Sequence, residues 1–139
     1  MAALYSPHLL SLAVELANYP FDKDKPAIGH ARSRTCGSTI SLSGGSPERI
    51  DDLGMRVAAC AVGQAAAAVF AQSAQGRDAA DIGHTLDELR GWIAGSGPAP
   101  DWPGIAALEP ALPHAGRHEA ILLPWRAALD ALCNERAGG

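Results

Sequence analysis

The fold is decided by two stretches, GHARSRTCGSTISLSGG at 29–45 and GMRVAACAVGQAAAAVF at 54–70. Between residues 28 and 57 apolar and polar residues alternate, which is the period of a strand with one buried face. The segment Ser43–Pro47 has the composition of a turn. After Cys60 the period becomes helical, in an alanine-rich run that Gly76 ends. These stretches predict a three-stranded antiparallel meander followed by a helix.

Helical patterns precede and follow the predicted sheet. Ser6 and Pro7 indicate the start of a first helix, which the sequence Asn18-Tyr19-Pro20 ends. Further helices are expected at about 77–94, in a short piece after Trp102, and in a last segment with Pro124 at or near its first turn, with a loop at 110–116. Strands followed by helices predict an α+β fold, in which the helices pack on one face of a small sheet.

Length and composition restrict the class of protein. The chain has 139 residues, 47% of them hydrophobic and 19% charged, which predicts one folded domain over 1–139. The net charge of −4 gives no electrostatic support for a nucleic-acid partner. The apolar run at 9–17 is interrupted by Glu15 and has no basic segment before it, so neither a membrane span nor a signal peptide is expected. We expect a monomer or a weak dimer.

The three cysteines are the main candidates for chemistry. An odd number argues against a disulfide framework and indicates a reducing, cytoplasmic compartment. Cys36 lies in the predicted turn beside Gly37, and Cys60 lies where a strand becomes a helix. Both positions end an element, so we expect the two thiols on one rim of the sheet, although buried packing is the commoner role for such cysteines. Cys133, four residues after Leu129, is expected in the core.

Histidine and carboxylate side chains add possible metal ligands. His118 and Glu119 precede the last predicted helix and offer a borderline and a hard ligand. His114 lies four residues before His118, but Pro113 and Gly116 argue against a continuous helix there. The chain has no closely spaced cysteine pair, phosphate-binding glycine loop or hydrolase elbow. A zinc finger, a nucleotide enzyme and a serine hydrolase are therefore not expected.

Three segments resemble one known family. The hairpin around TCGS at 35–38 and the sequence ACAVGQA at 59–65, which enters an alanine-rich helix, resemble the NifU/IscU-type iron–sulfur cluster assembly scaffolds. Leu4–Pro20 is similar to that family's opening helix and N-x-P loop, and 113–125 is similar to the segment with its third cysteine. The long interval after Cys60 resembles the SufU branch, which has an insertion there. The resemblance covers nearly the whole chain.

The resemblance implies a set of site residues. The family uses three cysteines, an aspartate two residues after the first, and often a histidine before the third. Those cysteine positions fall on Cys36, Cys60 and Glu119, the aspartate position on Ser38 and the histidine position on His118. Two thiolates, an imidazole and a carboxylate remain a set that can hold iron, an iron–sulfur cluster or tetrahedral zinc.

The implied function is that of a non-enzymatic scaffold. It would bind iron or an iron–sulfur cluster through Cys36 and Cys60, with His118 and Glu119 completing the site. Its implied partners are a cysteine desulfurase and apo iron–sulfur proteins. Two alternatives stay open: a zinc-binding, SufU-like sulfur-transfer protein, and a metal-free module that keeps only the surface for the desulfurase.

Overall fold

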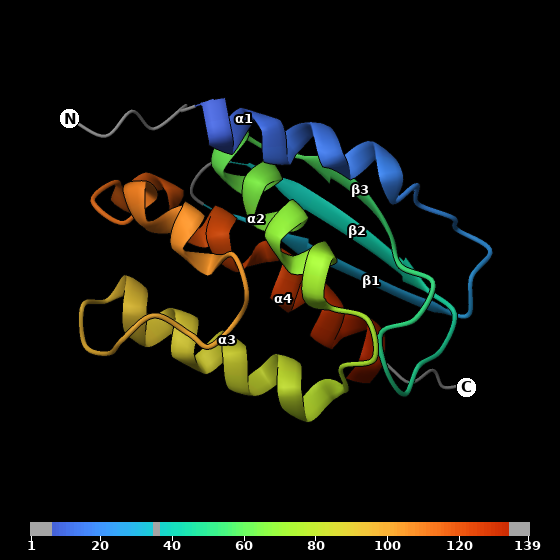
Figure 1. Cartoon of the computed structure of the whole chain (residues 1–139). Coiled ribbons are helices and arrows are strands. Elements are labelled where there is room, and N and C mark those ends of the chain that lie inside the picture. The colour runs from blue at the N-terminus through green and yellow to red at the C-terminus, as the bar shows by residue number, and fades with distance from the viewer. Residues whose placement is uncertain (1–6, 35–36, 134–139) are drawn as a thin grey trace.

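The computed structural model describes residues 7–34 and 37–133. A helix precedes the strands of the sheet, and further helices follow them (Figure 1). The elements are α1 (Pro7–Val14), η1 (Glu15–Asn18), β1 (Ala27–Arg32), β2 (Thr39–Gly44), β3 (Gly54–Ala58), α2 (Ala61–Ser73), α3 (Ala79–Ile93), η2 (Ile105–Ala111), η3 (Ala115–Arg117) and α4 (His118–Cys133). The η segments are 3₁₀ helices. No described helix is long and apolar enough to cross a membrane.

The three strands form one antiparallel sheet in the order β1-β2-β3. Ile40 of β2 lies between Ala31 of β1 and Val57 of β3, so apolar residues from all three strands face the same side. Ile40 and Leu42 are buried in the core. The alternation read from the sequence therefore predicted the sheet, its topology and its buried face correctly.

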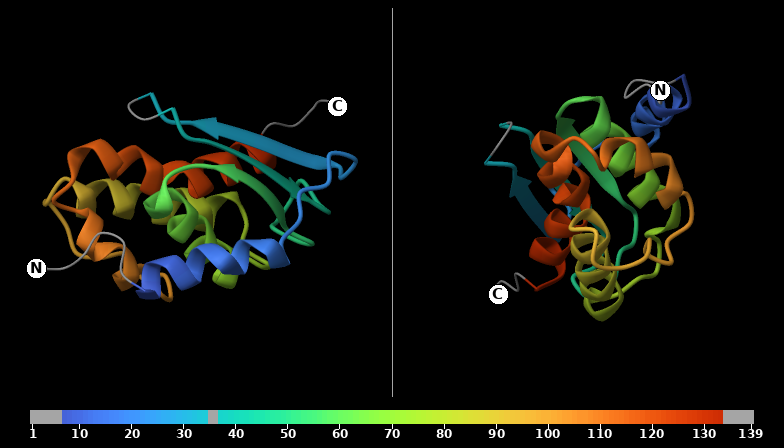
Figure 2. Two further views of the ribbon diagram at one scale, coloured as in Figure 1. Left: turned by 90° about the horizontal axis from the view of Figure 1, so that it is seen from above. Right: turned by 90° about the vertical axis from the view of Figure 1, so that its left-hand side faces the viewer.

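The helices lie on one face of this sheet, as predicted (Figure 2). Helix α4 lies directly on β1 and β2, with α3 packed against α4 and α1 against α2. The closest approach is at Gly29, where an added Cβ would lie 2.1 Å from the carbonyl oxygen of Ala127. A glycine in β1 is required there because the α4 backbone occupies the space of a side chain.

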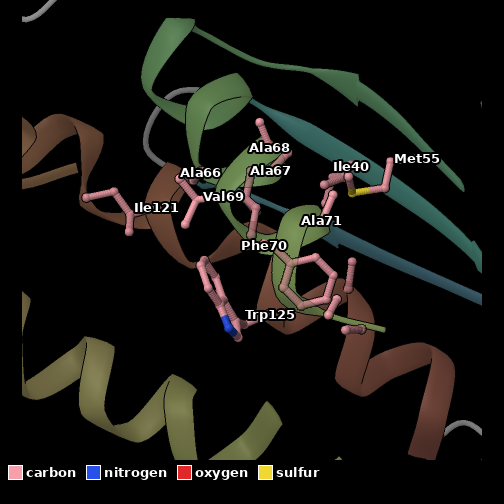
Figure 3. Packing of buried hydrophobic residues seen from close by; sticks show 14 of the residues in the cluster. Ile40, Met55, Ala66, Ala67, Ala68, Val69, Phe70, Ala71, Ile121 and Trp125 are labelled. Atoms are coloured by element: carbon pink, nitrogen blue, oxygen red, sulfur yellow. The ribbon is translucent and has the colours of Figure 1, made fainter. Parts of the chain in front are cut away.

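Helix α2 forms the centre of the core (Figure 3). Its alanines are small enough for α1 and α4 to approach closely, and most of them are fully buried. The ring of Phe70 stacks on Trp102 at 5.5 Å between centroids and meets Trp125 edge-on at 5.3 Å. Trp102 donates its indole N–H to the carbonyl of Val69 at 3.0 Å. This packing holds α2, and with it the position of Cys60, rigidly against α4.

The start of the last helix differs from the prediction. The sequence predicts Pro124 at or near the first turn, but α4 begins six residues earlier, at His118, and Pro124 is buried inside the helix. A proline inside a helix removes one main-chain hydrogen bond, at a cost of about 3 kcal/mol. Packing of α4 against the sheet, α2 and α3 offsets that cost. His118 and Glu119 consequently occupy the first turn of a long helix.

Two boundaries were also predicted inaccurately. The first helix is α-helical only to Val14 and then tightens to the 3₁₀ segment η1, while Ser6 lies outside the described residues. The expected loop at 110–116 is shorter, because η2 continues to Ala111 and η3 begins at Ala115. The ends of α2 and α3 agree closely with the prediction.

Candidate functional site

Three segments distant in sequence meet at one end of the sheet. Pairing of Thr39 with Ala58 places the β1–β2 connection beside the end of β3, where α2 begins. The amide of Ser33 donates to the carbonyl of Ser38 at 2.8 Å and closes the hairpin. The first turn of α4 reaches the same hairpin through Glu119. These described segments form one rim of the sheet, and Cys60 lies there at the start of α2.

Cys60 lies at the amino end of α2. Its backbone is extended, with φ −66° and ψ 173°, and its carbonyl accepts the amide of Gln64 at 2.9 Å. The thiol is free and half-buried. The side-chain amide of Gln64 donates to the carbonyl of Ala59 at 2.8 Å, so Gln64 binds the carbonyls of both Ala59 and Cys60. The predicted position at a strand-to-helix junction is confirmed.

Gly63 brings the first turn of α2 against the first turn of α4. A Cβ at Gly63 would lie 2.7 Å from the Cβ of Ala59 and 3.5 Å from that of Ala120. Ala120 directly follows Glu119, so this contact sets how close Cys60 lies to the start of α4. Close packing at Gly63 was not predicted from the sequence, although a single glycine within an alanine-rich run indicates such a position.

The other two cysteines cannot be placed at this rim. Cys36 lies outside the described residues, as does the side chain of Cys133. The predicted pairing of Cys36 with Cys60 thus stays a prediction. Ser38, at the position that resembles the family's aspartate, is buried. Within 7–34 and 37–133, no three His, Cys, Asp or Glu side chains form a group that could hold a metal ion.

Glu119 is bound to the hairpin. Its Oε1 accepts the main-chain N–H of Arg34 at 2.8 Å. This hydrogen bond is the main reason that the pKa of Glu119 lies below its ordinary value, and it outweighs the opposing effect of burial. A hydrogen bond from the Ser33 side chain and the charges of Arg126 and Arg34 lower it further. The carboxylate is therefore ionised at neutral pH and ties α4 to the residues just before Cys36.

His118 has a defined protonation pattern. Its Nε2 lies 2.6 Å from the carbonyl oxygen of Leu112, which can only accept a hydrogen bond. Nε2 therefore carries a proton, and in the neutral ring Nδ1 holds the lone pair. Histidines that bind metals commonly donate their second ring N–H to a carbonyl in this way. His114, by contrast, is exposed and precedes η3, so the two histidines do not share a helix.

The described chain forms a small antiparallel sheet with helices on one face. Solved NifU-like and SufU structures share this fold, which confirms the predicted resemblance at the level of the fold. No protein-family model matches the sequence, and no curated protein matches it.

Similar solved structures support the assignment of the fold. A NifU-like protein (N-terminal part) from Brucella abortus superposes with a TM-score of 0.82 and 26% identity, over 98% of this chain and 96% of that one. A candidate iron–sulfur cluster assembly scaffold for the SUF system, from Fervidobacterium islandicum, gives a TM-score of 0.80 at 17% identity, over 93% and 96%. A hypothetical protein gives 0.70 at 18% identity, over 91% and 97%.

Proposed function

We propose that this protein is a scaffold in iron–sulfur cluster assembly. The observation that carries the proposal is the agreement with the Brucella abortus NifU-like structure over 98% of the chain. The Fervidobacterium islandicum structure supports the same role, because it is described as a candidate cluster-assembly scaffold of the SUF system. A scaffold of this kind would hold a cluster and pass it on, and would not itself be an enzyme.

Cys36 and Cys60 are the proposed thiolate ligands for the iron or iron–sulfur cargo. Support comes from the position of Cys60 at the rim and from the hairpin that Glu119 holds beside Cys36 in sequence. His118 is the proposed third ligand through Nδ1, because its Nε2–H is already donated to Leu112. Glu119 is the proposed fourth, because a carboxylate that accepts one amide keeps further lone pairs.

The proposed partners follow from the same role. A cysteine desulfurase would supply sulfur, and apo iron–sulfur proteins would receive the cluster. Thiolates that hold a labile cluster need a reducing surrounding, which supports a cytoplasmic location.

Anaerobic reconstitution tests the role directly. The wild-type chain, supplied with ferrous iron and sulfide, is expected to develop the visible charge-transfer absorption of a cluster. Cys36→Ser and Cys60→Ser are each expected to lose that absorption. Cys133→Ser is the matched control, since it removes the third thiol from the opposite end of α4 and should retain the colour. A colourless product from the wild-type chain would contradict the proposal.

Zinc is the second candidate, and the hydrogen bond from His118 to Leu112 favours it. A neutral imidazole oriented by a carbonyl is an ordinary zinc ligand, and two thiolates with a carboxylate complete a tetrahedral set. The zinc would activate a thiolate for sulfur transfer. Metal analysis after purification without chelators is then expected to give about one zinc per chain, lost in Cys36→Ala and in Cys60→Ala.

A metal-free binding module is the third reading, and the hydrogen bond between Glu119 and Arg34 favours it. In that case Glu119, at the position where the resemblance implies a third cysteine, would only stabilise the fold and would bind no metal. The wild-type chain would retain neither zinc nor a cluster but would still bind a cysteine desulfurase. A pull-down that recovers no desulfurase would exclude this reading.

A further inference from the structure

The face of the sheet opposite the helices carries positive charge. His30 and Arg32 of β1 and Arg56 of β3 all point to this side, since they alternate with the core-facing residues, and all three are exposed. Ser41 lies between His30 and Arg56 in the register, and its hydroxyl lies 2.9 Å from Nδ1 of His30. Arg126 of α4 joins this group at the β1 side, where it lines a shallow hollow with His30 and Arg32. We call these four basic residues the basic face.

In the described part of the chain, no helix covers this side of the sheet (Figure 2). The ion pairs among the described residues lie elsewhere, in the 23–25 loop with Asp52 and along α3. The guanidinium of Arg56 instead lies 4.6 Å from the ring centroid of Phe21, which holds it in place on the face. The chain has a net charge of −4, so the basic face is a positively charged, outward-facing surface on a protein that is negative overall.

Helix α4 covers part of the free edge of β1. The outward amide of His30 donates to Oδ2 of Asp130 at 2.9 Å, and that of Arg34, just past the end of β1, donates to Oε1 of Glu119 at 2.8 Å. Because α4 uses these amides, a partner cannot bind by adding a strand at these positions. The exposed side chains on the face itself remain available to a ligand.

The spacing of the charges indicates the kind of ligand. Neighbouring strands lie about 4.8 Å apart, so His30 and Arg56, on the two outer strands, are about 10 Å apart at the backbone. Such a small, flat group suits the carboxylates of a short acidic segment. A nucleic-acid strand is disfavoured, because the chain is acidic overall and Arg56 covers the nearby aromatic ring of Phe21.

We propose that the basic face docks an acidic segment of a protein partner, through charge-assisted contacts of Arg32, Arg56 and Arg126 with its carboxylates. This docking uses neither cysteine and needs no metal, although Arg126 also lies near Glu119 of the rim. Its failure would therefore leave the proposed scaffold role untouched.

Fluorescence anisotropy with a labelled octaglutamate peptide tests the docking, on full-length protein without added iron. Binding at low salt is expected, and it should weaken as salt rises. Arg32→Glu and Arg56→Glu are each expected to weaken it about tenfold. Arg90→Glu is the matched control, because it makes the same charge change on an exposed position of α3, and it should stay within about twofold of the wild type.

Three results would overturn the proposal. The first is no binding of octaglutamate by the wild type at low salt, and the second is an equal loss in Arg32→Glu and Arg90→Glu. The third is tighter binding of a labelled octathymidine strand that depends on Arg32, which would make the surface a nucleic-acid site. Circular dichroism of each variant separates lost binding from lost folding.

Discussion

The carboxylate of Glu119 accepts the main-chain amide of Arg34 at 2.8 Å, across 85 positions of sequence. At the position where the resemblance implies a cysteine, this chain has a side chain that connects α4 to the hairpin before Cys36. The contact combines an ionised acceptor with a main-chain amide just past the end of β1, which is a stronger arrangement than a neutral hydrogen bond. It makes the geometry of the rim depend on one carboxylate.

Substitution of Glu119 separates its charge from its hydrogen bond. Glu119→Gln keeps a carbonyl oxygen that can accept the Arg34 amide, whereas Glu119→Ala removes the acceptor. Both variants are expected to unfold at lower temperature than the wild type, and the alanine variant at the lower of the two. Thermal unfolding followed by circular dichroism measures this. Equal midpoints for the wild type and Glu119→Ala would show that the contact contributes nothing to stability.

The same carboxylate should give stability a pH dependence. The pKa of Glu119 is lowered by folding from an ordinary value of 4.5, so the unfolded state binds the proton more readily. Its stabilising contribution is therefore complete above the unfolded value and is lost as the pH falls through the lower, folded one. Urea unfolding between about pH 7 and about pH 3 measures this. The free energy of unfolding of the wild type should exceed that of Glu119→Gln by a constant amount at first, and this difference should shrink below about pH 4.5. An advantage unchanged down to the lowest pH would contradict this.

The sequence predicted the sheet well, because alternation in β2 and β3 and the change of period at Cys60 are local signals. It predicted the start of α4 wrongly, because Pro124 satisfies the rule for a helix start while only tertiary packing shows that α4 tolerates it inside. The bond between Glu119 and Arg34 could not be predicted either. Its donor is a main-chain amide, which every residue but proline carries, so no residue type marks it.

Gly63 should not tolerate a side chain, although an alanine there would lengthen an alanine-rich run. The added Cβ would lie 2.7 Å from the Cβ of Ala59, so the segment that leads into α2 would have to shift. We expect Gly63→Ala to lower the free energy of unfolding by about 1–3 kcal/mol. Urea denaturation measures the change.

Gly83 provides the control for that substitution. It lies inside α3, and an added Cβ would come no closer than 3.9 Å to the side chain of Leu129. Gly83→Ala is therefore expected to raise stability by about 0.5–1 kcal/mol through helix propensity alone. If both variants changed stability in the same direction, close packing at Gly63 would not be the cause.

Asp130 should protect the free edge of β1. Its Oδ2 accepts the amide of His30 at 2.9 Å, so Asp130→Ala leaves that amide open to water. Hydrogen exchange at His30 is expected to accelerate about tenfold, which corresponds to a lost hydrogen bond of about 1.4 kcal/mol. The amide of Ser33, which donates to Ser38 on the other side of the strand, is the internal control and should exchange at an unchanged rate. Equal acceleration at both amides would mean that the whole hairpin opens, and unchanged exchange at His30 would mean that Asp130 does not cover the edge.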